Sequence, residues 1–145
     1  MLTIEDSTRI AASPEAIWRF LVDPTTFRTW WPGCLEATTA DRKLLHEGSE
    51  LRLLLAPSWI RLRVRARVEV AAPGKALIWV GHSAGLEGRH GFFLEERTGG
   101  MRVREQETLR GPTLPVLRLL RLDRATKRMF QENLKGLKRF AEQMV

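Results

Sequence analysis

The stretch from Asp123 to Met144, near the end of the chain, constrains the fold more than any other part of the sequence. Apolar residues recur in it at helical spacing, no proline interrupts it, and its first glycine is Gly136. Because a long helix is stabilised mainly by burial of its apolar stripe, we expect a large apolar partner surface elsewhere in the chain. The stripe consists of Leu122, Met129, Phe130, Leu134, Leu137, Ala141 and Met144.

The preceding part of the chain supplies this surface as a series of predicted strands. A short strand is expected at Thr3–Ile10, and two short helices follow it. Ser13 and Pro14 are typical of a helix start, Asp23 ends the first helix, and the second reaches Trp31. From residue 35 the apolar period changes to two, which predicts strands at Leu35–Thr39, Glu50–Leu55, Trp59–Val70, Ala76–His82, Arg89–Glu96 and Met101–Arg110.

The predicted strand Trp59–Val70 shows the pattern most clearly. Its apolar residues alternate with arginines, so one face is dry and the other is solvated. The dry face must meet the C-terminal helix. We therefore predict one α+β domain over residues 1–145, in which a curved antiparallel sheet of about seven strands wraps around the helix.

The composition is that of an ordinary globular domain, with 43% of the 145 residues hydrophobic and 28% charged. The net charge is +7, but the basic residues are spread along the chain and no tyrosine accompanies them, so we expect no nucleic-acid partner. Cys34 is the single cysteine, and we expect neither a disulfide nor a metal or cofactor site. Because no secretory signal or long apolar run is present, we expect a cytoplasmic protein.

Three polar residues are predicted to point into the concave side of the sheet. His90 shares a strand face with Phe92, and Glu105 and Glu107 share a face with apolar neighbours on the last strand. A two-residue turn at Thr98-Gly99 would set His90 opposite Glu107 and Phe92 opposite Glu105. The three groups could carry out general acid/base chemistry, or His90 and Glu107 could satisfy each other by a hydrogen bond. We favour the second interpretation.

The order of the predicted elements resembles the helix-grip arrangement of the START/Bet v 1-like (SRPBCC) superfamily over essentially the whole chain. The segment IAASPEAIWRFLVDPTTFRTWWPG resembles the amino-terminal signature of its bacterial polyketide cyclase/dehydrase-like branch. The segments LIWVGHSAGLEGRHGFFLEE, MRVREQETLRG and FQENLKGLKRFAEQM resemble its later strands and gripping helix. The resemblance implies a cavity between the sheet and the helix. The family often carries a histidine where Glu105 stands, and this departure weakens the case for an inherited catalytic role.

The first functional hypothesis is binding of a small hydrophobic or amphipathic molecule in this cavity. Its expected contacts are Trp30, Trp31, Leu53, Leu62, Val64, His90, Phe92, Glu105, Glu107, Met129, Phe130 and Leu134. The competing hypothesis is a cyclase- or dehydratase-type enzyme without a metal, in which His90, Glu105 and Glu107 are the catalytic candidates.

A third hypothesis is a lipid or quinone carrier that touches a membrane. The segment from Pro115 to Arg128 is basic and amphipathic enough to rest on an acidic membrane surface. The apolar residues that would meet the bilayer are Leu117, Leu119, Leu120 and Leu122. The sequence leaves the ligand and the oligomeric state open.

Overall fold

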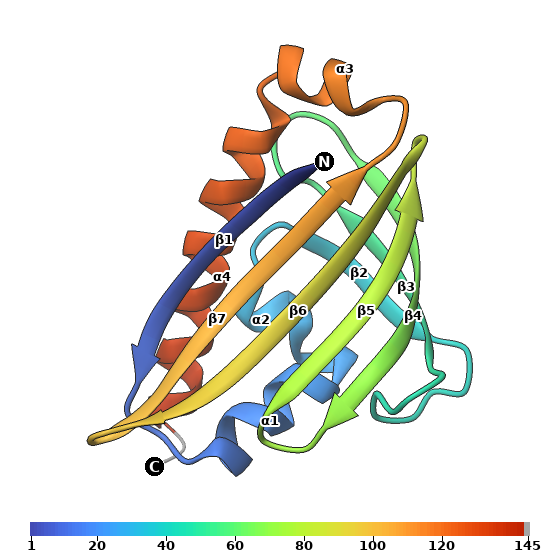
Figure 1. The fold of residues 1–145 in the computed structure, drawn as a ribbon. Helices are drawn as coiled ribbons and strands as arrows, with labels where there is room; N and C mark the ends of the chain where they lie inside the picture. Colours follow the sequence, from blue (N-terminus) through green and yellow to red (C-terminus); the bar gives the residue numbers. More distant parts are fainter. Residues whose placement is uncertain (144–145) are drawn as a thin grey trace.

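One curved antiparallel sheet and one long helix make up most of the structure (Figure 1). The computed structural model describes residues 1–143, so the predicted place of Met144 on the helical stripe lies outside the described residues. The order of strands in the sheet is β1-β7-β6-β5-β4-β3-β2. The strands are β1 (Leu2–Ile10), β2 (Cys34–Thr39), β3 (Glu50–Leu55), β4 (Leu62–Ala72), β5 (Ala76–Ser83), β6 (Leu86–Arg97) and β7 (Gly100–Arg110).

The long helix α4 (Leu122–Gln143) lies against the concave side of the sheet and packs most closely on β1. The apolar stripe predicted for it is buried at every described position. This arrangement confirms the predicted α+β helix-grip fold, with a seven-stranded antiparallel sheet around the C-terminal helix. Among the described residues, no helix is both long enough and apolar enough to cross a bilayer.

Short helices connect β1 to β2 as the sequence predicted. The helix α1 (Pro14–Val22) is capped by Ser13, whose hydroxyl accepts a hydrogen bond of 3.1 Å from the backbone N–H of Ala16. A single 3₁₀ turn, η1 (Pro24–Thr26), then leads into α2 (Phe27–Trp30). A further short helix, α3 (Leu114–Leu119), connects β7 to α4. This helix was not predicted.

The prediction that a strand begins at Trp59 is wrong. The strand β4 begins at Leu62, which pairs with Leu55 as the last pair between β3 and β4. Residues 56–61 form the connection instead, and at its start the N–H of Ala56 donates to the carbonyl of Gly33, just before β2, at 2.7 Å. Trp59 is consequently 76% exposed at the tip of this β3–β4 loop.

Candidate functional site

The register between β6 and β7 places the polar residues as the sequence predicted. Arg97 pairs with Gly100 around a two-residue turn, which sets Phe92 opposite Glu105 and His90 opposite Glu107. His90 and Glu105 are buried, with 3% and 0% of their surface exposed. Glu107 is partly buried and faces the same concavity. The predicted inward phase of all three residues is confirmed.

The hydrogen bond of His90 goes to a different carboxyl group from the predicted one. His90 Nε2 lies 2.8 Å from Glu105 Oε2, and no hydrogen bond joins the imidazole to Glu107 within the described part of the chain. Glu105 is the diagonal neighbour of His90 across the two strands, and diagonal side chains are within reach of each other when they are long. The predicted His90–Glu107 pair is therefore wrong as a hydrogen bond, although the two residues do lie opposite each other.

A helical residue that sequence reasoning missed completes this cluster. Asn133 of α4 is fully buried, and its Nδ2 lies 3.4 Å and 3.3 Å from the two carboxyl oxygens of Glu105. The signal was its position, since Asn133 stands three residues after Phe130 on the buried stripe. A polar residue on such a stripe needs a partner inside the protein. Asn133, Glu105 and His90 thus link α4, β7 and β6.

Aromatic rings surround the imidazole of His90. The indole of Trp79 stacks on it, with ring centroids 4.5 Å apart and an angle of 16° between the planes. Phe92 and Phe130 meet it edge-on at centroid distances of 4.8 Å and 5.8 Å. Trp31 lies nearly parallel to it at 6.0 Å. Because these rings exclude water, they disfavour a charge on the imidazole.

Burial sets the protonation of the cluster. It lowers the pKa of His90 from 6.5 to about 4, although the charge of Glu107 acts in the opposite direction. It raises the pKa of Glu105 well above its ordinary value, against the effect of the Asn133 hydrogen bond and with a contribution from the charge of Asp6. It also raises the pKa of Glu107, an effect that His90 opposes and Glu105 reinforces. With a pKa of about 4, His90 is uncharged at neutral pH, and burial shifts Glu105 toward its protonated form.

The uncharged imidazole of His90 carries one proton, on Nδ1 or on Nε2. Asn133 donates to Glu105 through its amide, so a protonated Glu105 would have its acid proton available for the 2.8 Å contact with His90. In that state His90 would accept at Nε2 and carry its own proton on Nδ1. That Nδ1 is buried and has no hydrogen-bond partner among the described residues, and the same is true of Nε1 of Trp31. Two buried ring nitrogens among the described residues are therefore without a partner, and that of Trp31 is a donor.

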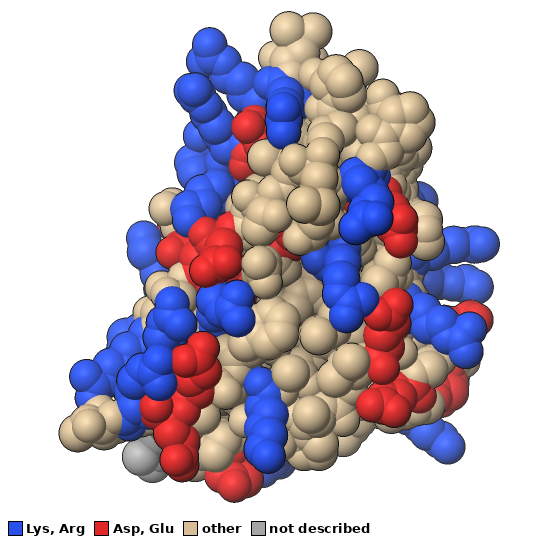
Figure 2. Space-filling model, in the orientation of Figure 1, with Lys and Arg blue, Asp and Glu red and all other residues tan. Residues whose placement is uncertain are grey.

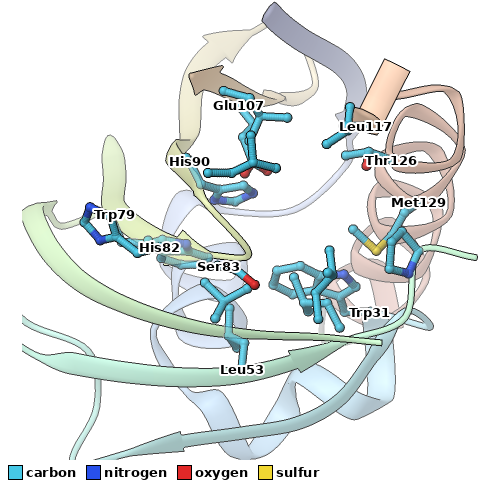
Figure 3. A pocket seen from close by; sticks show the side chains of 18 residues that line it. Trp31, Leu53, Trp79, His82, Ser83, His90, Glu107, Leu117, Thr126 and Met129 are labelled. Atoms are coloured by element: carbon cyan, nitrogen blue, oxygen red, sulfur yellow. The ribbon is translucent and has the colours of Figure 1, made fainter. Parts of the chain in front are cut away.

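Trp31 and His90 both line a pocket between the sheet and the helices α3 and α4. Figure 3 shows Glu107 and His90 on one side of it, Trp31 and Leu53 on another, and Met129 on the helical side. Its volume is about 80 Å³, several times the roughly 10–15 Å³ that one water molecule requires. Gly88 also lines it, where a Cβ would lie 2.5 Å from the carboxyl oxygen of Glu107, so glycine leaves room for that side chain.

The residues predicted as ligand contacts divide into two groups. The first group lines the pocket and consists of Trp31, Leu53, Leu62, Val64, His90, Glu107 and Met129. The second group lies behind this lining, in the buried core, and consists of Trp30, Phe92, Glu105, Phe130 and Leu134. Sequence phase identifies the face on which a side chain lies, but not its depth. The second group therefore supports the lining residues from behind.

The curved sheet, the long C-terminal helix and the pocket between them define a helix-grip protein that has a cluster of buried polar side chains inside it. A family model described as "Polyketide cyclase / dehydrase and lipid transport" matches residues 1–142, and the chain belongs to this family. No curated protein that was compared matches the chain significantly.

Solved structures of low sequence identity share the fold. One from Thermus thermophilus has a TM-score of 0.82 at 14% identity, with 99% of each chain covered. A hypothetical protein of Helicobacter pylori has a TM-score of 0.80 at 18% identity, covering 97% of this chain and 88% of its own. A protein of Chromobacterium violaceum has a TM-score of 0.72 at 17% identity, with 97% of each chain covered. At such identities the likeness establishes the fold.

Proposed function

We propose that the protein binds a small, mainly apolar molecule that carries a hydrogen-bond acceptor, in the pocket between the sheet and α4. The observation that carries this proposal is a pair of buried ring nitrogens without a partner among residues 1–143, Trp31 Nε1 and His90 Nδ1, on residues that line one apolar pocket. A buried donor without a partner costs about 1–3 kcal/mol. A carbonyl or similar acceptor on a ligand would recover part of that free energy.

The apolar lining supports the same proposal. Leu53, Leu62 and Val64 come from the sheet, and Met129 comes from the helix, so an apolar ligand body meets side chains on both sides. Pockets of this type place a few polar groups within an apolar wall, and the polar groups orient the ligand. The volume of about 80 Å³ suits a small ligand or one end of a longer molecule.

A second candidate function is proton transfer to or from a bound molecule. The observation that favours it is Glu107, a carboxyl group with a raised pKa that lines the pocket. His90 is a poor base at neutral pH because its pKa is about 4. Glu107→Gln would distinguish the two functions, since this variant should still bind an apolar molecule but could not exchange a proton with it. A candidate substrate that wild type and variant convert equally would exclude a role for Glu107.

The binding proposal can be tested by filling the pocket. Val64→Phe should occupy the cavity and weaken binding of 6-propionyl-2-(dimethylamino)naphthalene, an uncharged fluorescent probe with a carbonyl acceptor at one end, by at least about tenfold if roughly 1.4 kcal/mol of contact is lost. Val80→Phe is the matched control, because Val80 lies on β5 but does not line this pocket. Equal binding by both variants would contradict the proposal. Native mass spectrometry of protein purified from its own host would then identify a retained ligand.

A further inference from the structure

One end of the molecule exposes a group of large apolar side chains. Four of them form what we call the apolar tip: Trp59 at 76% exposure, Val116 at 53%, Leu119 at 81% and Leu120 at 41%. Trp59 comes from the β3–β4 loop, and the other three come from α3 and the residue after it. Figure 1 shows this loop and α3 at the same end of the sheet.

The pocket gives separate evidence that the β3–β4 loop and α3 lie close together. Pro57 of the β3–β4 loop and Leu117 of α3 both line the pocket, so the pocket's outer end lies beneath the tip. The prediction that Leu117 and Leu122 would meet a membrane is wrong. Both are buried, at 6% and 7% exposure, and so they cannot meet a bilayer. The apolar surface that is available consists instead of Val116, Leu119 and Leu120, together with Trp59.

Unpaired cations border the apolar tip. Asp123 is the single acidic residue between positions 111 and 128, whereas the exposed arginines there are Arg118, Arg121, Arg124 and Arg128. Within residues 1–143, none of these four arginines takes part in an ion pair. Figure 2 shows basic side chains gathered beside an uncharged cap over α3.

We propose that this end of the protein docks on a bilayer that contains anionic lipids, with the apolar tip inserted at the interface. Exposed leucine, valine and tryptophan side chains gain by entering the boundary between headgroups and acyl chains. The arginines beside them would lie at the level of the lipid phosphates. A second copy of the chain is a poorer partner, because pairing two tips would bring like-charged arginines together.

Docking in this orientation would turn the pocket's outer end toward the bilayer. If the pocket binds an apolar molecule, as proposed above, that molecule could pass between bilayer and protein with little exposure to water. This consequence rests on the proposed function. The docking itself does not, because the apolar tip and the arginines are surface features that remain when the pocket is filled.

The test is flotation of the purified protein with vesicles of phosphatidylcholine alone or mixed with phosphatidylglycerol. We expect binding to the mixed vesicles that weakens as salt rises, and little binding to the neutral ones. The double variant Arg118→Gln and Arg124→Gln should lose binding by roughly fivefold per arginine removed. Its control is Arg52→Gln with Arg65→Gln, which removes the same charge from exposed positions on β3 and β4.

The apolar contribution is tested separately. Val116→Ser with Leu119→Ser should reduce binding several-fold, whereas Leu44→Ser should not, although Leu44 is also 57% exposed. The proposal is overturned if mixed vesicles do not bind the protein at low salt, or if the serine pair binds as well as the wild type. Self-association that disappears in the serine pair would identify a second copy as the occupant and would also overturn it. Val64→Phe, which fills the pocket, should still float with the vesicles.

Discussion

The backbone carbonyl of Trp30 lies directly against Gly136 of α4. A Cβ at position 136 would be 2.2 Å from the Trp30 oxygen and 3.0 Å from its carbonyl carbon, so glycine permits the contact between α2 and α4. The contact holds the backbone just before Trp31, whose indole lines the pocket. A glycine in the middle of the helix is thus explained by the position of α2.

Gly136→Ala should destabilise the protein, although alanine is favoured over glycine in a helix by about 1 kcal/mol. The clash is with backbone atoms, which cannot rotate away, and overpacking of this kind costs about 1–3 kcal/mol. Urea unfolding would measure the difference, with Gln131→Ala on the exposed face of α4 as a near-neutral control. A gain in stability for the alanine variant would show that α2 and α4 are further apart.

Leu134→Ala should lower the free energy of unfolding by about 2–5 kcal/mol, because Leu134 is 2% exposed and packs in the core. Lys135→Ala should change it by less than about 0.5 kcal/mol, since this lysine is exposed and makes an ion pair of 3.5 Å with Glu132 at the surface. Thermal melting of the two variants would check the assignment. Equal melting temperatures would mean that the buried face of α4 is assigned wrongly.

His90 should keep its uncharged imidazole throughout the neutral range and titrate at about pH 4. NMR titration would show this, and His46 should titrate above 6.5 because its hydrogen bond to Asp41 raises its pKa. Glu107→Gln should lower the pKa of His90 further, since the charge of Glu107 favours the imidazolium. Nitrogen chemical shifts should report the proton on Nδ1. A proton on Nε2 would contradict the proposed hydrogen bond from Glu105.

The pKa of His90 also affects stability. The folded value of about 4 is below the unfolded value of 6.5, so the unfolded chain binds more protons between these two pH values. Stability that is present above pH 6.5 is therefore lost as pH falls toward 4, by at most about 1.4 kcal/mol for each pH unit.

Glu105→Gln should become more stable relative to the wild type as pH rises. The folded pKa of Glu105 is raised above 4.5, so its contribution is fully present below 4.5 and is lost as pH rises through the folded value. Glutamine cannot ionise and escapes this loss, and its amide can still donate to His90. Chemical denaturation across a pH series would measure the effect. A difference that stays constant with pH would mean that Glu105 ionises as readily in the folded protein as in the unfolded chain.

The periodicity of the sequence was sufficient to predict the sheet, the long helix and the register around Thr98-Gly99. Alternation along a strand determines which side chains share a face, and a two-residue turn determines which residues lie opposite each other. The choice between Glu105 and Glu107 as the partner of His90 could not be predicted. It depends on how the carboxyl side chains are oriented and on Asn133, which approaches from a helix far away in the sequence.

The features at the end of the pocket were harder to predict for a different reason. The helix α3 is short, so its periodicity is weak, and the exposure of Leu119 rather than Leu117 depends on how that turn sits over the pocket. Trp59 fits the alternating pattern of the strand that follows it, but the pairing between β3 and β4 ends at Leu55 and Leu62. In both places tertiary contacts override the local pattern.

The pairing of β1 with β7 determines when this protein can fold. Leu2 lies opposite Leu109, so β1 has no neighbour in the sheet until β7 has been synthesised. The helix α4, which follows β7 in the chain, then packs against β1. Contacts between such distant parts of a chain form slowly, and an unpaired first strand is exposed to aggregation in the meantime. During synthesis β1 therefore waits longer for its neighbour than any other strand of the described sheet.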